Sequence, residues 1–205
     1  MTIVSNLRSA GSVVASTPLG QARQIMGPNY FGPSEAETCF RINSTHAPEV
    51  PFSQQMLHDC AQSYVLVLVY PVPIYDLARE CESLFYLNKY SRCWQLLSTE
   101  NLAEPRWHLI RKNSVPGSVE KSWDKQQALL EPGELIPTAQ VMVYTIIGHY
   151  RARQERLFAN EKVRTSSSGD IGPICVGQFS PLGLVMSDSS ATAARSNIGI
   201  CAAVT

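Results

Sequence analysis

The sequence predicts an α+β protein with a helical N-terminal lead-in, central strand–helix units with one long buried helix, and a small C-terminal β-sheet. Three observations lead to this prediction. The run YVLVLVY at 64–70 is continuously apolar and rich in β-branched and aromatic residues, which is typical of a strand buried on both faces. Residues 138–158, TAQVMVYTIIGHYRARQERLF, are apolar all round in their first half, as in a central helix. Short apolar runs joined by Gly, Ser and Pro follow and indicate a sheet.

The chain of 205 residues fits one domain, and 44% of its residues are hydrophobic, so a core can form. We divide it into a loose N-terminal arm at 1–17, a helical lead-in at 18–62 and an α+β core at 63–205. Three short helices are expected in the lead-in. The first is LGQARQIM, which ends at Gly27. The second starts at Ser34, which is followed by Glu37 at the spacing of a capping box, and the third opens at Ser53.

The core begins with the strand at 64–70 and continues into IYDLARECESLFYL at 74–87, whose apolar residues follow helical spacing. A second strand is expected at WHLIRK, 107–112, followed by a helix over 119–130. Gly148 in the long helix indicates close approach by another element. After that helix, a small sheet or β-meander is expected from four segments: KVRTS (162–166), ICVGQF (174–179), LGLVM (182–186) and NIGICAAV (197–204).

Several segments resemble a family of uncharacterised bacterial and phage-associated proteins, over most of the chain from Ile25 onward. The segments are MGPNYFGPSEA, PFSQQMLHDC, WHLIRKNSVPGS with the downstream QQALL, PTAQVMVYTIIGHYRARQERLF and VRTSS. The resemblance implies no activity. Family members carry an acidic, aromatic-containing stretch between the segments that match 182–184 and 197–199. Here that stretch reads VMSDSSATAARS with Asp188 as its only acid, so a metal or carboxylate site there is in doubt.

A candidate anion-binding loop lies between the second strand and the helix expected after it. Arg111, Lys112 and Lys121 could surround an anion, and the backbone amides at Ser118 would add donors at a helix N-terminus. Arg164, with the hydroxyls at 165–168, could bind phosphate in the same way. The alternative is a strand-to-helix connection in which Pro116 and Gly117 turn the chain, Ser118 caps the helix and the charges are solvated. Helix caps are far commoner than ligand sites, so the sequence favours the connection.

Catalytic motifs are missing from the sequence. It has no Walker or dinucleotide fingerprint, no GxSxG and no HExxH, so no cofactor is expected. His58 and Cys60 point in opposite directions on one helix. His108 or His149 could act as a base, but a core or surface role is favoured for His108 and a hydrogen-bonded core position for His149. The cysteines are scattered without a CxxC pair, which predicts reduced structural thiols and no metal site: Cys39, Cys60, Cys81, Cys93, Cys175 and Cys201.

Composition narrows the possible partners. Seventeen basic residues balance seventeen acidic ones, which leaves no large field to attract nucleic acid or anionic lipid. Trp94, Trp107 and Trp123 could stack on bases but more often anchor a core. Only 17% of the residues are charged, which suits a surface covered in a larger assembly.

The N-terminal segment 1–15 has no signal-peptide pattern, and the longest apolar run is about half a membrane span, so a cytoplasmic protein without membrane contact is expected. We therefore expect a non-enzymatic binding or assembly protein that acts through a protein interface, as a homo-oligomer or within a larger protein assembly. The alternative is a small enzyme that uses the anion-binding loop at 111–121, with His108 or His149 as its base.

Overall fold

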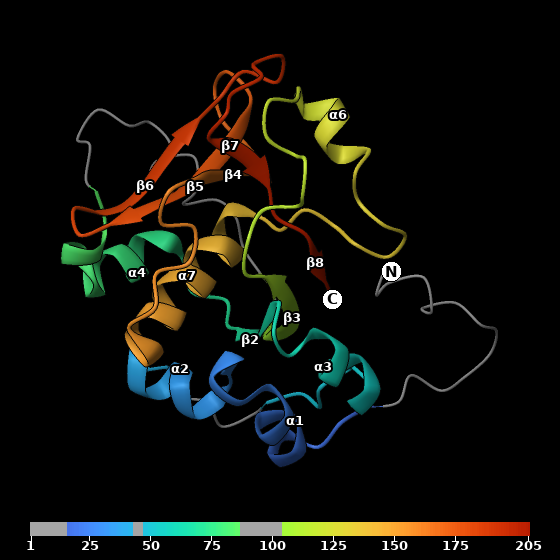
Figure 1. Ribbon diagram of the computed structural model, residues 1–205. Coiled ribbons are helices and arrows are strands. Elements are labelled where there is room, and N and C mark those ends of the chain that lie inside the picture. The colour runs from blue at the N-terminus through green and yellow to red at the C-terminus, as the bar shows by residue number, and fades with distance from the viewer. Residues whose placement is uncertain (1–15, 43–46, 87–103) are drawn as a thin grey trace.

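The computed structural model describes residues 16–42, 47–86 and 104–205 of the chain. It has two four-stranded sheets with the long helix α7 (Ala139–Arg153) between them, and Figure 1 shows short helices gathered below the first sheet. The α+β class is therefore confirmed. Because α7 contacts strands of both sheets, its residues from Ala139 to His149 are all buried, as the apolar first half of the segment predicted.

The first sheet has the order β1-β2-β3-β8, with the bounds β1 (Tyr30–Phe31), β2 (Tyr64–Val69), β3 (Arg106–Arg111) and β8 (Ala203–Val204). All six residues of β2 are buried, which confirms a strand covered on both faces. β1 runs parallel to β2, while β3 is antiparallel to both of its neighbours.

The second sheet has the order β6-β5-β4-β7, with the bounds β4 (Lys162–Ser168), β5 (Pro173–Ser180), β6 (Gly183–Asp188) and β7 (Ile198–Ile200). The first three are successive antiparallel strands, as in a meander, but β7 returns to pair in parallel with β4. The segment predicted as one strand at 197–204 is divided at Cys201 and Ala202, and its second part joins the first sheet as β8. The C-terminal segment thus links the two sheets.

The helices of the lead-in are α1 (Leu19–Met26), the 3₁₀ turn η2 (Gly27–Asn29), α2 (Pro33–Phe40) and α3 (Gln54–Cys60). Ser53 caps α3 as predicted, since its hydroxyl accepts a hydrogen bond from Met56 N at 3.2 Å. The predicted cap of α2 is wrong. Glu35 accepts from Gly32 N at 3.1 Å, because Pro33 occupies the first helical position and places the cap at Gly32.

Three helices of the core are shorter than the sequence predicts. α4 (Ile74–Glu80) gives way to the 3₁₀ turn η3 (Glu82–Leu84). α6 (Trp123–Gln127) begins after Ser122 instead of Ser118, because Glu120 has a left-handed φ of 58° that no helix can include. α7 ends at Arg153, since Gln154 is left-handed as well. Thr138 caps its start by accepting from Val141 N at 3.3 Å.

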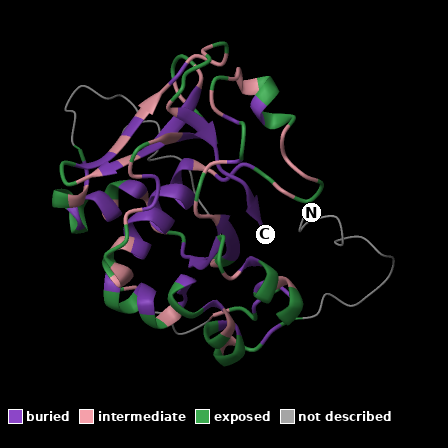
Figure 2. Cartoon of the chain, in the orientation of Figure 1, coloured by how far each residue is buried: buried purple, intermediate pink, exposed green. Residues whose placement is uncertain are grey.

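Buried residues of the lead-in and of the core belong to one hydrophobic cluster, which extends from Ala22 to Val204. Figure 2 shows this burial running through α7 and the strands on either side of it. Gly148 confirms the predicted close approach, because a Cβ there would lie 2.9 Å from the ring of Phe31. A smaller cluster forms around Val115 and Ile200, and Trp123 packs against it.

Candidate functional site

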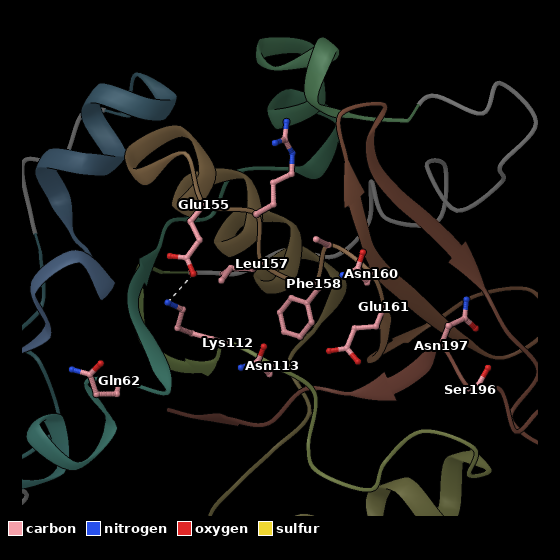
Figure 3. A pocket seen from close by; sticks show the side chains of 12 residues that line it. Gln62, Lys112, Asn113, Glu155, Leu157, Phe158, Asn160, Glu161, Ser196 and Asn197 are labelled. Atoms are coloured by element: carbon pink, nitrogen blue, oxygen red, sulfur yellow. Dashed lines mark ion pairs between the residues drawn. The ribbon is translucent and has the colours of Figure 1, made fainter.

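A pocket of about 660 Å³ lies where four segments meet: the turn between α3 and β2, the loop after β3, the loop after α7 and the turn before β7 (Figure 3). Its lining is mostly polar. Amide, hydroxyl, carboxylate and basic side chains outnumber the apolar ones, which are Leu157, Phe158 and Ala159. The polar and charged members are Gln62, Lys112, Asn113, Glu155, Arg156, Asn160, Glu161, Ser196 and Asn197.

The loop after α7 is shaped by two left-handed residues, Gln154 and Phe158, with φ values of 58° and 52°. Between them Leu157 is buried, and the ring of Phe158 is buried too, so the loop is anchored in the core. This anchoring leaves the polar residues on either side, Glu155 and Glu161, to face the pocket. The buried residues Leu157 and Phe158 therefore form the base of the pocket, while Glu155 and Glu161 offer it hydrogen-bonding groups.

A chain of three side chains connects the core to this pocket. The Nε2 atom of His149 lies 2.9 Å from Oε2 of Glu155, and Lys112 Nζ lies 2.9 Å from Oε1 of the same carboxylate. Figure 3 shows the ion pair between Lys112 and Glu155. His149 is only 2% exposed, whereas Glu155 is 50% exposed. The carboxylate thus closes over a buried imidazole.

The charges of this chain follow from its surroundings. Burial lowers the pKa of His149, against the opposing effect of the Glu155 contact. Hydrogen bonds from His149 and then from Lys112 lower the pKa of Glu155. At neutral pH the imidazole is therefore uncharged and donates Nε2–H to an ionised carboxylate, whose charge Lys112 balances.

Glu161 is held differently. Its Oε1 accepts from Ser114 N at 3.1 Å and its Oε2 accepts from Ser114 Oγ at 2.8 Å. Within the described ranges, no Lys, Arg or His side chain forms an ion pair with it. The neighbouring Lys162 donates to Ser187 instead. Glu161 is therefore a carboxylate fixed by Ser114 that forms no ion pair with any described side chain.

Arg156 also lines the pocket, but its guanidinium packs against two aromatic rings in cation–π contacts. The group lies 4.5 Å from the ring centre of Tyr150 and 5.4 Å from that of Phe179, and it donates to the Tyr150 hydroxyl at 3.1 Å.

The five residues proposed for anion binding have different partners. Arg111 lies over the ring of Tyr64 at 5.9 Å, and Lys112 pairs with Glu155 in the pocket. Ser118 is buried and its Oγ accepts from Ile200 N at 3.2 Å. Lys121 contributes its backbone carbonyl to Arg164 at 3.2 Å. Of the five, Lys112 alone lines the pocket.

Arg164 is completely buried within β4, and the residues 165–168 whose hydroxyls were proposed to bind phosphate with it belong to the same strand. Its guanidinium donates to Gln126 Oε1 at 2.7 Å, to Ser190 O at 3.1 Å and to Ala193 O. No carboxylate among the described residues pairs with it, so carbonyl and amide oxygens balance its charge. Arg164 therefore fastens two loops to β4.

The loop after β3 covers the outer edge of β7. Val115 N donates to Ile200 O at 2.9 Å, and Ser118 Oγ accepts from Ile200 N. Gln126 Nε2 donates to Ile198 O at 2.9 Å. An exposed edge strand is a template for unwanted pairing, and these contacts occupy its free backbone groups. The connection favoured by the sequence thus has a structural role.

The other candidate groups lie inside the fold. His108 on β3 is 5% exposed, both of its ring nitrogens lack a hydrogen-bond partner among the described residues, and burial lowers its pKa to about 4. Trp107 is a core residue that donates to Pro48 O at 2.8 Å. The described cysteines are buried free thiols: Cys39, Cys60, Cys81, Cys175 and Cys201. Cys93 and Trp94 lie outside the described residues.

Sequence reasoning missed Glu155, Glu161 and the asparagines of the pocket. No motif marks them, because they come together only after the left-handed turn at Gln154. The available signal was the polar composition of QERLFANEK after an apolar helix.

A comparison with protein-family models, curated protein sequences and solved structures finds no match to this chain. Among the described residues, no three His, Cys, Asp or Glu side chains gather closely enough to hold a metal ion. Across the same residues, no helix combines the length and apolar character that crossing a membrane requires.

Proposed function

We propose that this chain is a non-enzymatic binding or assembly protein that acts through a protein interface that includes the pocket beside Glu161. The observation that carries the proposal is the lining itself, a concave surface of amides and charged groups that the chain's own hydrogen bonds hold in place. Groups fixed in advance lose little conformational freedom when a partner binds.

A protein partner suits the pocket better than a small apolar ligand. Pockets for small molecules are lined mainly by hydrophobic and aromatic side chains. Here the apolar members Leu157 and Phe158 are buried in the core, and the exposed members are polar, among them Asn113 and Asn160. Polar, accessible surfaces of this kind form the rims of protein interfaces.

The proposed partner is a second copy of this chain or another protein of a larger assembly. The low share of charged residues, 17%, supports a surface that is covered in the assembled state. A cytoplasmic location is part of the proposal, because the five described cysteines are free thiols, which a reducing compartment maintains. The bacterial or phage-associated origin implied by the resemblance belongs to the same proposal.

One observation favours the alternative, a small enzyme. The Glu155 carboxylate contacts the His149 imidazole, as carboxylates do when they orient a catalytic base. Against this, His149 is buried under the carboxylate, so a substrate can reach the imidazole only after Glu155 moves.

Native mass spectrometry on gently purified full chain tests the proposal. We expect an oligomer or a retained protein partner, which the double substitution Asn113→Tyr and Asn160→Tyr removes by filling the pocket. Ile171→Tyr is the matched control, because residue 171 follows the opposite end of β4 from the pocket and is exposed. A wild-type chain that is always a bare monomer contradicts the proposal, as does a complex that the double variant retains.

A further inference from the structure

We propose that the pocket receives a cationic side chain of the protein partner, an arginine guanidinium or a lysine ammonium, with Glu161 as its counter-ion. The inference rests on the proposed function and adds the chemistry of the group that is recognised.

The charges of the pocket are unevenly paired. Lys112 is neutralised by Glu155 at 2.9 Å, and Arg156 lies against the rings of Tyr150 and Phe179. Among the described residues, Glu161 accepts from the neutral donors of Ser114 and forms no ion pair. The pocket therefore contains one carboxylate that no described side chain contacts as an ion pair. An approaching cation would pair with the Glu161 carboxylate, whereas an anion would have to displace Glu155 from Lys112.

The carboxylate of Glu161 has room for further hydrogen bonds. A carboxylate offers about four lone-pair positions, and Ser114 occupies one on each oxygen. Because a backbone N–H and a hydroxyl fix its orientation, the remaining positions are held ready before a ligand arrives. Charge-assisted hydrogen bonds to such a group are about twice as strong as neutral ones.

Amide side chains supply the other acceptors that a cationic group with several N–H donors needs. Figure 3 shows Glu161 near Asn113, with Asn160 and Asn197 along the same side of the pocket. An amide oxygen accepts hydrogen bonds from a guanidinium or ammonium without adding charge. A carboxylate in a pocket that also carries neutral amides thus suits a single positive charge.

The test titrates ¹⁵N-labelled full chain with three probes: N-acetyl-arginine amide, its uncharged isostere N-acetyl-citrulline amide, and inorganic phosphate. We expect the arginine probe to shift the amide signals of Ser114 and Glu161 in a saturable way, with a dissociation constant of about 1–10 mM for so small a ligand. The citrulline probe should bind about tenfold more weakly, because it lacks the charge. N-acetyl-lysine amide then distinguishes ammonium from guanidinium recognition.

Glu161→Gln is the decisive variant, because its amide oxygen can still accept from Ser114 while the charge is lost. We expect it to weaken arginine binding about tenfold. Asp124→Asn on α6 removes a carboxylate outside the pocket lining and should leave binding unchanged. A native spectrum of unliganded Glu161→Gln establishes that it folds. Equal shifts from arginine and citrulline, undiminished binding by Glu161→Gln, or saturable phosphate binding at the pocket would overturn the inference.

The two proposals fail in different ways. If Glu161→Gln leaves both arginine-probe binding and the complex in native mass spectrometry unchanged while the double tyrosine variant loses the complex, the interface stands and the cationic contact is wrong. If the arginine probe binds at Glu161 but the wild-type chain forms no complex, the site is real and the interface proposal is wrong.

Discussion

Oε2 of Glu155 lies 2.9 Å from Nε2 of His149, which joins a half-exposed carboxylate to the most deeply buried helix of the fold. The contact depends on the turn at Gln154, which folds the chain back over the end of α7. It places a neutral imidazole beneath the pocket rim and leaves the carboxylate to hold Lys112. Either the contact anchors a binding surface or it orients a base, and access to His149 distinguishes the two.

Diethyl pyrocarbonate labelling measures that access. We predict that His149 reacts at least about tenfold more slowly than the exposed His58, because opening of the structure must precede its reaction. Glu155→Ala should speed the labelling of His149 and leave that of His58 unchanged. Peptide mass spectrometry reads both sites in one sample. Equal rates for the two histidines in the wild-type chain would favour the enzyme alternative.

His108 should make stability depend on pH. Its folded pKa of about 4 lies below the ordinary histidine pKa of 6.5, so the unfolded chain binds the proton first and stability falls as pH decreases from 6.5 towards 4. The difference between the two pKa values corresponds to a loss of about 3 kcal/mol in unfolding free energy once the pH is below both. Urea unfolding at several pH values measures this dependence. Between pH 6.5 and 4, the His108→Leu variant should lose less unfolding free energy than the wild-type chain. His149 titrates in the same direction, so the slope is reduced and does not vanish. Identical slopes would contradict the burial of a neutral His108.

Arg164 should be worth several kcal/mol to the fold. Arg164→Met leaves Gln126 Oε1 and the carbonyls of Ser190 and Ala193 without their donor, so we expect a loss of about 3–5 kcal/mol in unfolding free energy. Arg195→Met is the control at an exposed arginine and should change stability by about 0.5 kcal/mol or less. Urea denaturation measures both, and equal losses would mean that Arg164 has no special role.

The cover over β7 can be tested at a single backbone amide. Ser118→Ala removes the acceptor of Ile200 N, so hydrogen exchange at Ile200 should quicken and stability should fall by about 1–3 kcal/mol. Ser166→Ala makes the same chemical change at an exposed site on β4 and should leave that exchange rate unaltered. An unchanged rate at Ile200 in Ser118→Ala would show that the edge is protected by other contacts.

Gly148 and Gly20 form a matched pair of helical glycines. Gly148→Ala places a methyl 2.9 Å from the ring of Phe31, which should destabilise the chain by about 1–3 kcal/mol. Gly20→Ala in α1 meets no atom within 4 Å and should stabilise it by up to about 1 kcal/mol through helix propensity. Thermal unfolding of both variants checks the opposite signs. A stabilising Gly148→Ala would mean that Phe31 does not pack against α7.

Local sequence patterns predicted the elements that the core determines. β2 and the start of α7 follow directly from continuous apolar runs, and Ser53 from its position before an amphipathic segment. The start of α6 was mispredicted because the left-handed Glu120 depends on the loop that surrounds it. The division between β7 and β8 was also missed, because it depends on which sheet each half of one apolar segment joins.

The pocket was less accessible to sequence reasoning. Lys112 and His149 were each singled out, but the residue that links them, Glu155, was not. The ion pair between Lys112 and Glu155 joins the loop after β3 to the loop after α7. It requires the chain to reverse direction at the left-handed residue Gln154. The charges near residue 111 suggested an anion site, whereas the folded chain gives Arg111 and Lys112 separate partners. Charge pairing of this kind is settled by tertiary structure.

The most direct test of the interface proposal is carboxylate labelling with glycine ethyl ester, performed in gentle extracts of producing cells and on the purified, diluted chain. We predict that Glu155 and Glu161 are protected in the extract, while the exposed Glu120 is labelled equally in both samples. Equal labelling of all three carboxylates in the two samples would contradict the account, because the pocket would then be uncovered where its partner is present.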